Sequence, residues 1–205
     1  MQRLVGFAAV FLIATLTAAG QSRKAFADAS LYDKVVERVF ETSLAAPPDG
    51  NLIVLRFSSG DTKEFQLAVA ETPSQTTLSA ERWRIPESAA SIWVQLSQRA
   101  DANPRLAVED AAKAIHVEHQ RGTIPASGDL ARLVSSHRSL SLPLTGRTEF
   151  HLDGAQYLIR IRSVGEDIDV HLDGPADPSD SKDPIISWMG RVRRAAENVS
   201  LQSSS

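Results

Sequence analysis

Alternation of apolar and polar side chains over residues 147–173 constrains the fold more than any other feature of the sequence. Apolar residues recur at every second position in three runs, which is the period of a strand with one buried face. Asp153-Gly154 separates the first two runs, and this dipeptide is typical of a two-residue type I′ hairpin. The third run follows a second turn, for which we expect a four-residue loop over 164–167. The pattern therefore predicts a three-stranded antiparallel meander over 147–173.

A second hairpin is predicted over residues 52–70, where two apolar runs flank Ser59-Gly60-Asp61. Shorter runs with period two occur at 81–85 and 115–119. Helical patterns are expected over 30–44, from Pro86, over 104–114 with Asn103 as the cap, from a cap at Ser127, and from Pro184. The strands are not regularly separated by helices. The sequence therefore predicts an α+β fold, in which amphipathic helices pack on one face of an antiparallel sheet.

The first residues predict export. An apolar run from Leu4 to Gly20 follows Arg3, and Ala25-Phe26-Ala27 supplies the small side chains of a signal peptidase site. Residues 1–27 are therefore interpreted as a signal peptide cleaved before Asp28, and an earlier cut near Gly20 stays open. The apolar run has about the minimum length for a membrane span, roughly 17 residues. An uncleaved N-terminal anchor is thus the alternative.

The chain contains no cysteine, so a disulfide framework and a lipoprotein anchor are both excluded. We expect residues 28–200 to form a single globular domain with an apolar core, followed by a disordered tail over 201–205. The leader carries three basic residues and no acid, so its removal changes the formal net charge from −3 to −6. This charge argues against nucleic acid as a partner. The one basic cluster, Arg191, Arg193 and Arg194, lies near the end of a predicted helix, where cations complement the helix dipole.

The five histidines do not predict a metal site. In a strand over 115–119, His116 and His119 would lie on opposite faces. His151 and His171 would lie on the two outer strands of the meander, about 16 Å apart by ideal sheet spacings. His137 falls at the edge of a helical apolar stripe.

Three acids at a spacing of three residues are candidate calcium ligands: Asp177, Asp180 and Asp183. They lack the ligand order and the central glycine of an EF-hand, so a solvated acidic loop is the simpler interpretation. No G-x-S-x-G motif, glycine-rich phosphate loop or nucleophilic cysteine is present in the sequence. The sequence therefore names no catalytic residue, no metal ligand and no cofactor.

The function predicted from the sequence is that of an exported, periplasmic or secreted, non-enzymatic domain with a binding or accessory role. Its partner would be an unidentified protein or small molecule. Two alternatives stay open: a secreted hydrolase that uses scattered carboxylates, and a membrane-tethered accessory subunit that keeps its leader. A pocket with two carboxyl groups of divergent pKa would favour the hydrolase. A broad exposed apolar patch would favour partner binding.

Overall fold

The structure is a computed structural model that describes residues 31–59, 63–72, 75–140 and 155–201. The chain divides into two compact units, one from residues 1–39 and 92–114 and the other from residues 40–91 and 115–205. The predicted signal peptide lies outside the described residues, as does all of the predicted tail except Leu201. The single domain expected over 28–200 stays a prediction.

In the first unit, the described residues form three helical segments. These are a helix over 31–39, the larger part of α2 (Ala89–Ala102), and α3 (Val108–Lys113). Val35 and Val36 are fully buried, as expected of the apolar face of an amphipathic helix.

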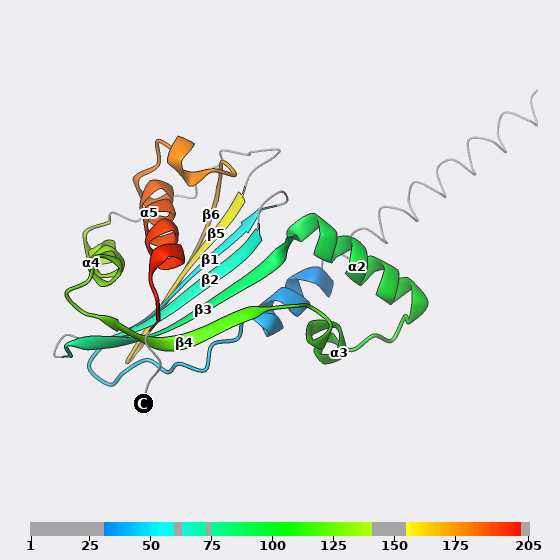
Figure 1. The fold of residues 1–205 in the computed structure, drawn as a ribbon, viewed down its shortest axis with the longest axis horizontal. Helices are drawn as coiled ribbons and strands as arrows, with labels where there is room; N and C mark the ends of the chain where they lie inside the picture. The colour runs from blue at the N-terminus through cyan, green and yellow to red at the C-terminus, as the bar shows by residue number, and fades with distance from the viewer. Residues whose placement is uncertain (1–30, 60–62, 73–74, 141–154, 202–205) are drawn as a thin grey trace, which may run out of the picture. The chain divides into compact units, whose positions relative to one another are not determined.

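The second unit contains a six-stranded sheet in which every neighbouring pair is antiparallel (Figure 1). The strands are β1 (Asn51–Ser59), β2 (Lys63–Glu71), β3 (Thr77–Ser88), β4 (Glu118–Pro125), β5 (Ala155–Ser163) and β6 (Glu166–Gly174). Their order across the sheet is β4-β3-β2-β1-β5-β6, so β4 and β6 form the edges. The predicted α+β fold with an antiparallel sheet is confirmed.

Two helices, α4 (Asp129–Ser135) and α5 (Pro184–Asn198), cover one face of this sheet (Figure 1). Their apolar side chains pack with alternate residues of five strands into one core. α5 begins at Pro184 as predicted, and Asp183 caps it by accepting a hydrogen bond from the Ile185 amide at 2.8 Å. At its other end, Arg82 of β3 donates to the carbonyls of Ala196 and Val199, which a helix leaves without internal partners. Both ends of α5 are thereby fixed by side-chain hydrogen bonds.

The second turn of the predicted meander is shorter than expected. Ser163 pairs with Glu166, so the turn consists of Val164 and Gly165 rather than of residues 164–167. Gly165 has a φ of 88°, a conformation that costs glycine little and that the tight connection requires. The register shifts accordingly: His171 lies opposite Leu158, whereas a four-residue loop over 164–167 would have set it opposite Arg160.

The other neighbour of β5 is also different from the one predicted. β5 pairs along Ala155–Arg162 with β1, and this is the edge of β5 that the predicted meander assigned to residues 147–152. Residues 147–154, with His151 and the Asp153-Gly154 turn, lie outside the described residues. The apolar alternation identified a strand at 155–163 correctly, but it carries no information about which distant strand offers a free edge.

Pro86 does not begin a helix. It lies inside β3, beside the register shift between Lys63 and Phe65, where the ladder is interrupted and its missing N–H is tolerated. The strand predicted over 81–85 therefore extends to Ser88, and α2 begins at Ala89.

Two further helix starts were predicted too early. α3 begins at Val108, because the side chain of Asn103 accepts a hydrogen bond from the Arg105 amide in a local turn instead of capping a helix. α4 begins at Asp129 after a turn in which the Gly128 amide bonds to the Pro125 carbonyl, and Gly128 occupies the cap position predicted for Ser127.

Candidate functional site

Residues 40–46, called the strap below, follow the helix over 31–39 and have no regular helical or strand structure apart from a turn at Phe40. The sequence predicted that the helix continues to Leu44, and that prediction was wrong. The hydroxyl of Thr42 accepts a hydrogen bond from the Leu44 amide at 3.1 Å, a local bond that competes with helix formation. The strap crosses the face of the sheet opposite α4 and α5. The strand residues that alternate with the core residues point toward this face.

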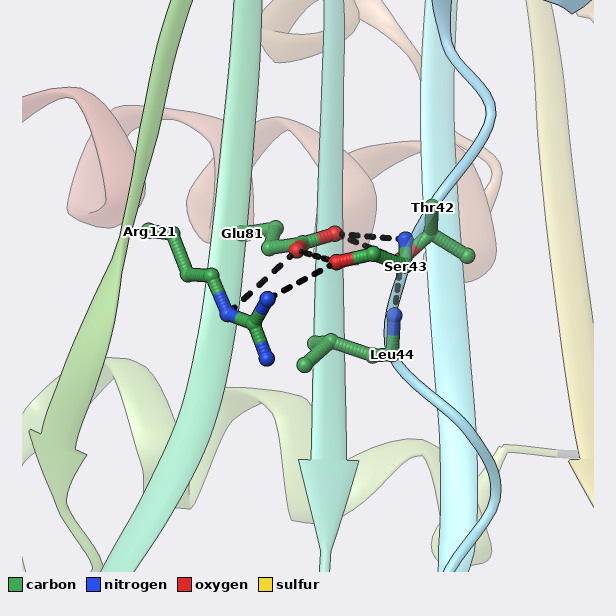
Figure 2. Close-up of polar contacts among 5 residues, drawn as sticks. All are labelled: Thr42, Ser43, Leu44, Glu81 and Arg121. Atoms are coloured by element: carbon green, nitrogen blue, oxygen red, sulfur yellow. Dashed lines mark hydrogen bonds and ion pairs between the residues drawn. The ribbon is translucent and has the colours of Figure 1, made fainter. Parts of the chain in front are cut away.

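Glu81 of β3 is the main anchor of the strap (Figure 2). Its carboxylate is completely buried. It accepts hydrogen bonds from the Thr42 hydroxyl at 2.8 Å, from the Ser43 amide at 3.1 Å and from the Ser43 hydroxyl. Arg121 of β4 places its Nε 3.6 Å from the same carboxylate. These donors satisfy the buried charge, which would otherwise be costly.

The protonation of Glu81 follows from these contacts. Burial by itself would raise the pKa of Glu81, but the hydrogen bonds from Ser43 and Thr42 outweigh it, and the pKa lies below its ordinary value. The charge of nearby His119 acts in the same direction. Glu81 is thus an ionised anchor rather than a proton donor at neutral pH.

Two other strands hold the beginning of the strap. Gln66 of β2 is buried and donates to the Phe40 carbonyl at 2.6 Å. The guanidinium of Arg56 on β1 lies 5.3 Å from the centre of the Phe40 ring, within the range of a cation–π contact. Adjacent strands β1 to β4 therefore each contribute one polar side chain to the strap or its anchor.

The outer end of this arrangement lies on the edge strand β4, where the residues from Glu118 to Arg121 are exposed. The imidazole of His119 stacks on the buried indole of Trp83, with ring centres 4.8 Å apart and planes within 12°. Arg121 lies two residues further along on the same face. The Arg121 Nη1 donates to the Ser43 hydroxyl at 3.1 Å, whereas its Nη2 points away from both Ser43 and Glu81 in Figure 2. The edge thus presents the Arg121 guanidinium and the His119 imidazole, both held in place by contacts with the sheet.

The structure places the candidate residues from the sequence in different elements. β4 begins at Glu118, so His116 precedes the strand and does not share it with His119, as the predicted strand over 115–119 required. His137 lies in a 3-10 turn with its Nδ1 2.9 Å from the Val134 carbonyl. Among the described residues, no group of three or more His, Asp or Glu side chains could hold a metal ion.

The acids of the predicted solvated loop serve local structure. Asp177 accepts hydrogen bonds from the amide and hydroxyl of Ser179, which lower its pKa, and Asp183 caps α5. Asp169 of β6 pairs with Arg162, and although burial alone would raise its pKa, these arginine contacts lower it.

The basic cluster of α5 does not lie in the last turn of the helix. Arg193 pairs with Glu197 at 3.2 Å, and its guanidinium lies 5.6 Å from the centre of the Phe57 ring. This arginine covers the aromatic core instead of complementing the helix dipole.

The strap and its anchors were not identified from the sequence. Glu64 and Gln66 alternate with the apolar residues of β2, a pattern typical of a strand with one solvated face, yet both are buried. The available signal was the pair of hydroxyl residues, Thr42 and Ser43, at the end of a helical stripe. Such residues favour helix ends over helix interiors.

Comparison with known proteins finds no match: no family model fits the chain, and no curated protein or solved structure is significantly similar to it. Among the described residues, no helix is long and apolar enough to cross a membrane.

Proposed function

We propose that this protein is an exported, non-enzymatic domain that binds a partner through the sheet edge formed by β4. The observation that carries the proposal is that two buried carboxylates, Glu81 and Glu71, already bind other segments of the chain. The Glu81 carboxylate accepts a hydrogen bond from the strap and pairs with Arg121. Glu71 accepts hydrogen bonds from Ser135 and from Arg138, the latter at 2.9 Å. These carboxylates fasten segments of the chain to the sheet.

Acid–base catalysis by two carboxyl groups requires pKa values that are pushed apart. The pKa values of Glu81, Asp169 and Asp177 are instead all below their ordinary values, each because donors or cations surround the charged form. These three acids would be ionised at neutral pH and poorly suited to donate a proton. This supports a binding role over the hydrolase alternative.

The β4 edge is the best candidate for the binding surface. In the part of the chain that the structure describes, β4 ends the sheet. An edge strand has backbone N–H and C=O groups without a strand partner, and it is a common site for partner binding. On α2, Trp93 and Val94 are also exposed, with 36% and 47% of their surface accessible. Two adjacent apolar side chains do not form a broad patch, so the polar edge has the stronger case.

Export and binding can be tested together on protein recovered from its native host with a C-terminal affinity tag. Intact mass should show a mature chain that begins at Asp28 or near Gly20, because the leader carries a peptidase site. The exported fraction should yield a specific partner or small molecule that co-purifies with the tagged protein. A chain that still begins at Met1 would contradict cleaved export, and capture of nothing beyond the control would contradict the binding role.

A further inference from the structure

Arg121 is an arginine whose position is already fixed before any ligand arrives. Its Nε faces buried Glu81 at 3.6 Å and its Nη1 donates to Ser43 at 3.1 Å, while 58% of its side-chain surface stays exposed. Ordering a long side chain normally opposes binding, and these two contacts reduce that cost. The Nη2 of the guanidinium points away from Glu81 and Ser43 (Figure 2).

His119 supplies a second fixed donor beside Arg121. Residues two apart on a strand lie about 7 Å apart on the same face. The His119 ring is held flat against Trp83, which limits its rotation. The intervening Gln120 lies on the other face, where it bonds to Arg82. An oxygen-bearing group above the edge could therefore reach both donors at once.

The charges around Arg121 and His119 favour an anionic ligand. The neighbouring carboxylate, Glu81, is fully buried and already accepts hydrogen bonds from Thr42 and Ser43, so its charge is compensated. The Arg121 guanidinium and the His119 ring are exposed groups that can donate N–H bonds at this edge. The Ser43 hydroxyl donates to Glu81 and accepts from Arg121, so it offers no further donor. A guanidinium binds carboxylate or phosphate oxygens in a planar, two-pronged geometry.

We propose that Arg121 and His119 form a binding site for an oxyanion, namely a carboxylate or phosphate group of the ligand. This inference rests on the proposed binding function and names the chemistry of its site. The group could belong to a small molecule or to the side chain of a bound polypeptide, because both present the same oxygens.

The test is an NMR titration of the mature, tag-free protein with inorganic phosphate and, separately, with acetate at constant ionic strength. Saturable shifts of the His119 ring and of the β4 amides are expected with at least one anion, with a dissociation constant in the millimolar range. Arg121→Lys keeps the positive charge but removes the two-pronged geometry of the guanidinium. It should weaken anion binding about tenfold, the effect of losing one favourable hydrogen bond. His119→Gln should weaken binding severalfold and, since His119 is exposed, offers a second variant if Arg121→Lys perturbs the strap.

The matched control is Arg132→Gln, because Arg132 is an exposed arginine on α4 that pairs with Asp129. It should leave the titration unchanged. Shifts that do not saturate, or that weaken equally in Arg132→Gln, would overturn the oxyanion site. Capture of the same partner by the wild-type protein and by both site variants would also overturn the oxyanion site, but it would leave the binding function standing. Anion binding without capture of any partner would instead count against the binding function.

Discussion

Replacing Trp188 with alanine is expected to lower the free energy of unfolding of the sheet unit by about 3–5 kcal/mol, the usual cost of deleting a buried aromatic side chain. Trp188 is 1% exposed and belongs to the core between α4, α5 and the sheet. Its indole N–H also donates to the Leu133 carbonyl at 2.7 Å. The substitution would therefore leave a cavity and a half-buried carbonyl without its donor. Urea denaturation followed by circular dichroism measures the effect.

Trp93 provides a matched control for this prediction because it is the same residue type on a helix but lies at the surface, 36% exposed. Trp93→Ala should change the free energy of unfolding by less than about 1 kcal/mol, as expected of most surface substitutions. Equal denaturation midpoints for Trp188→Ala and the wild type would mean that α5 does not pack on the sheet as described.

Replacing Glu81 with alanine is expected to cost about 3 kcal/mol, because it removes a buried charged acceptor and leaves its donors without a partner. The Thr42 and Ser43 hydroxyls and the Ser43 amide would all lose this acceptor. Arg121 is more than half exposed and can turn to water, which limits the loss. The strap should become accessible to solvent, so hydrogen exchange at the Ser43 amide should accelerate along with the drop in unfolding free energy.

Glu118→Gln is the control for Glu81→Ala, since Glu118 is an exposed acid on the neighbouring strand. It should leave both the stability and the exchange rate at Ser43 close to those of the wild type. If Glu81→Ala behaved like this control, the contacts of Phe40 with Gln66 and Arg56 would be enough to hold the strap, and Glu81 would not be its main anchor.

Local signals in the sequence predicted the elements whose determinants are themselves local. The start of α5 is an example, because Asp183 and Pro184 are an N-cap and a first helical residue that need no distant partner. The β1–β2 hairpin is another, since its two strands are close in sequence and share an apolar face. In both cases the side chains that specify the structure are neighbours along the chain.

The features that were missed depend on distant partners. β5 pairs with β1 across about a hundred residues of sequence, and nothing in either strand alone indicates that pairing. The strap likewise depends on Glu81, 38 residues after Ser43. Burying a glutamate is costly in isolation, so a sequence pattern places it on the surface unless its donors are known.

The dependence of stability on pH follows from the anchor role of Glu81. Its pKa is lower in the folded protein than in the unfolded chain, so its contribution to stability is present above the unfolded pKa. That contribution should be lost as the pH falls through the lower, folded pKa. A carboxyl group poised for proton donation would behave in the opposite way.

The pKa of Glu81 can be measured directly by carbon-13 NMR titration of its side-chain carboxyl in the folded protein. A structural anchor requires a midpoint below 4.5, the ordinary value for glutamate, because Ser43, Thr42 and nearby His119 favour the charged form. Glu81→Gln identifies the resonance by its disappearance. A midpoint above 4.5 would contradict the anchor role and would restore acid–base chemistry at this carboxyl as an explanation for the site.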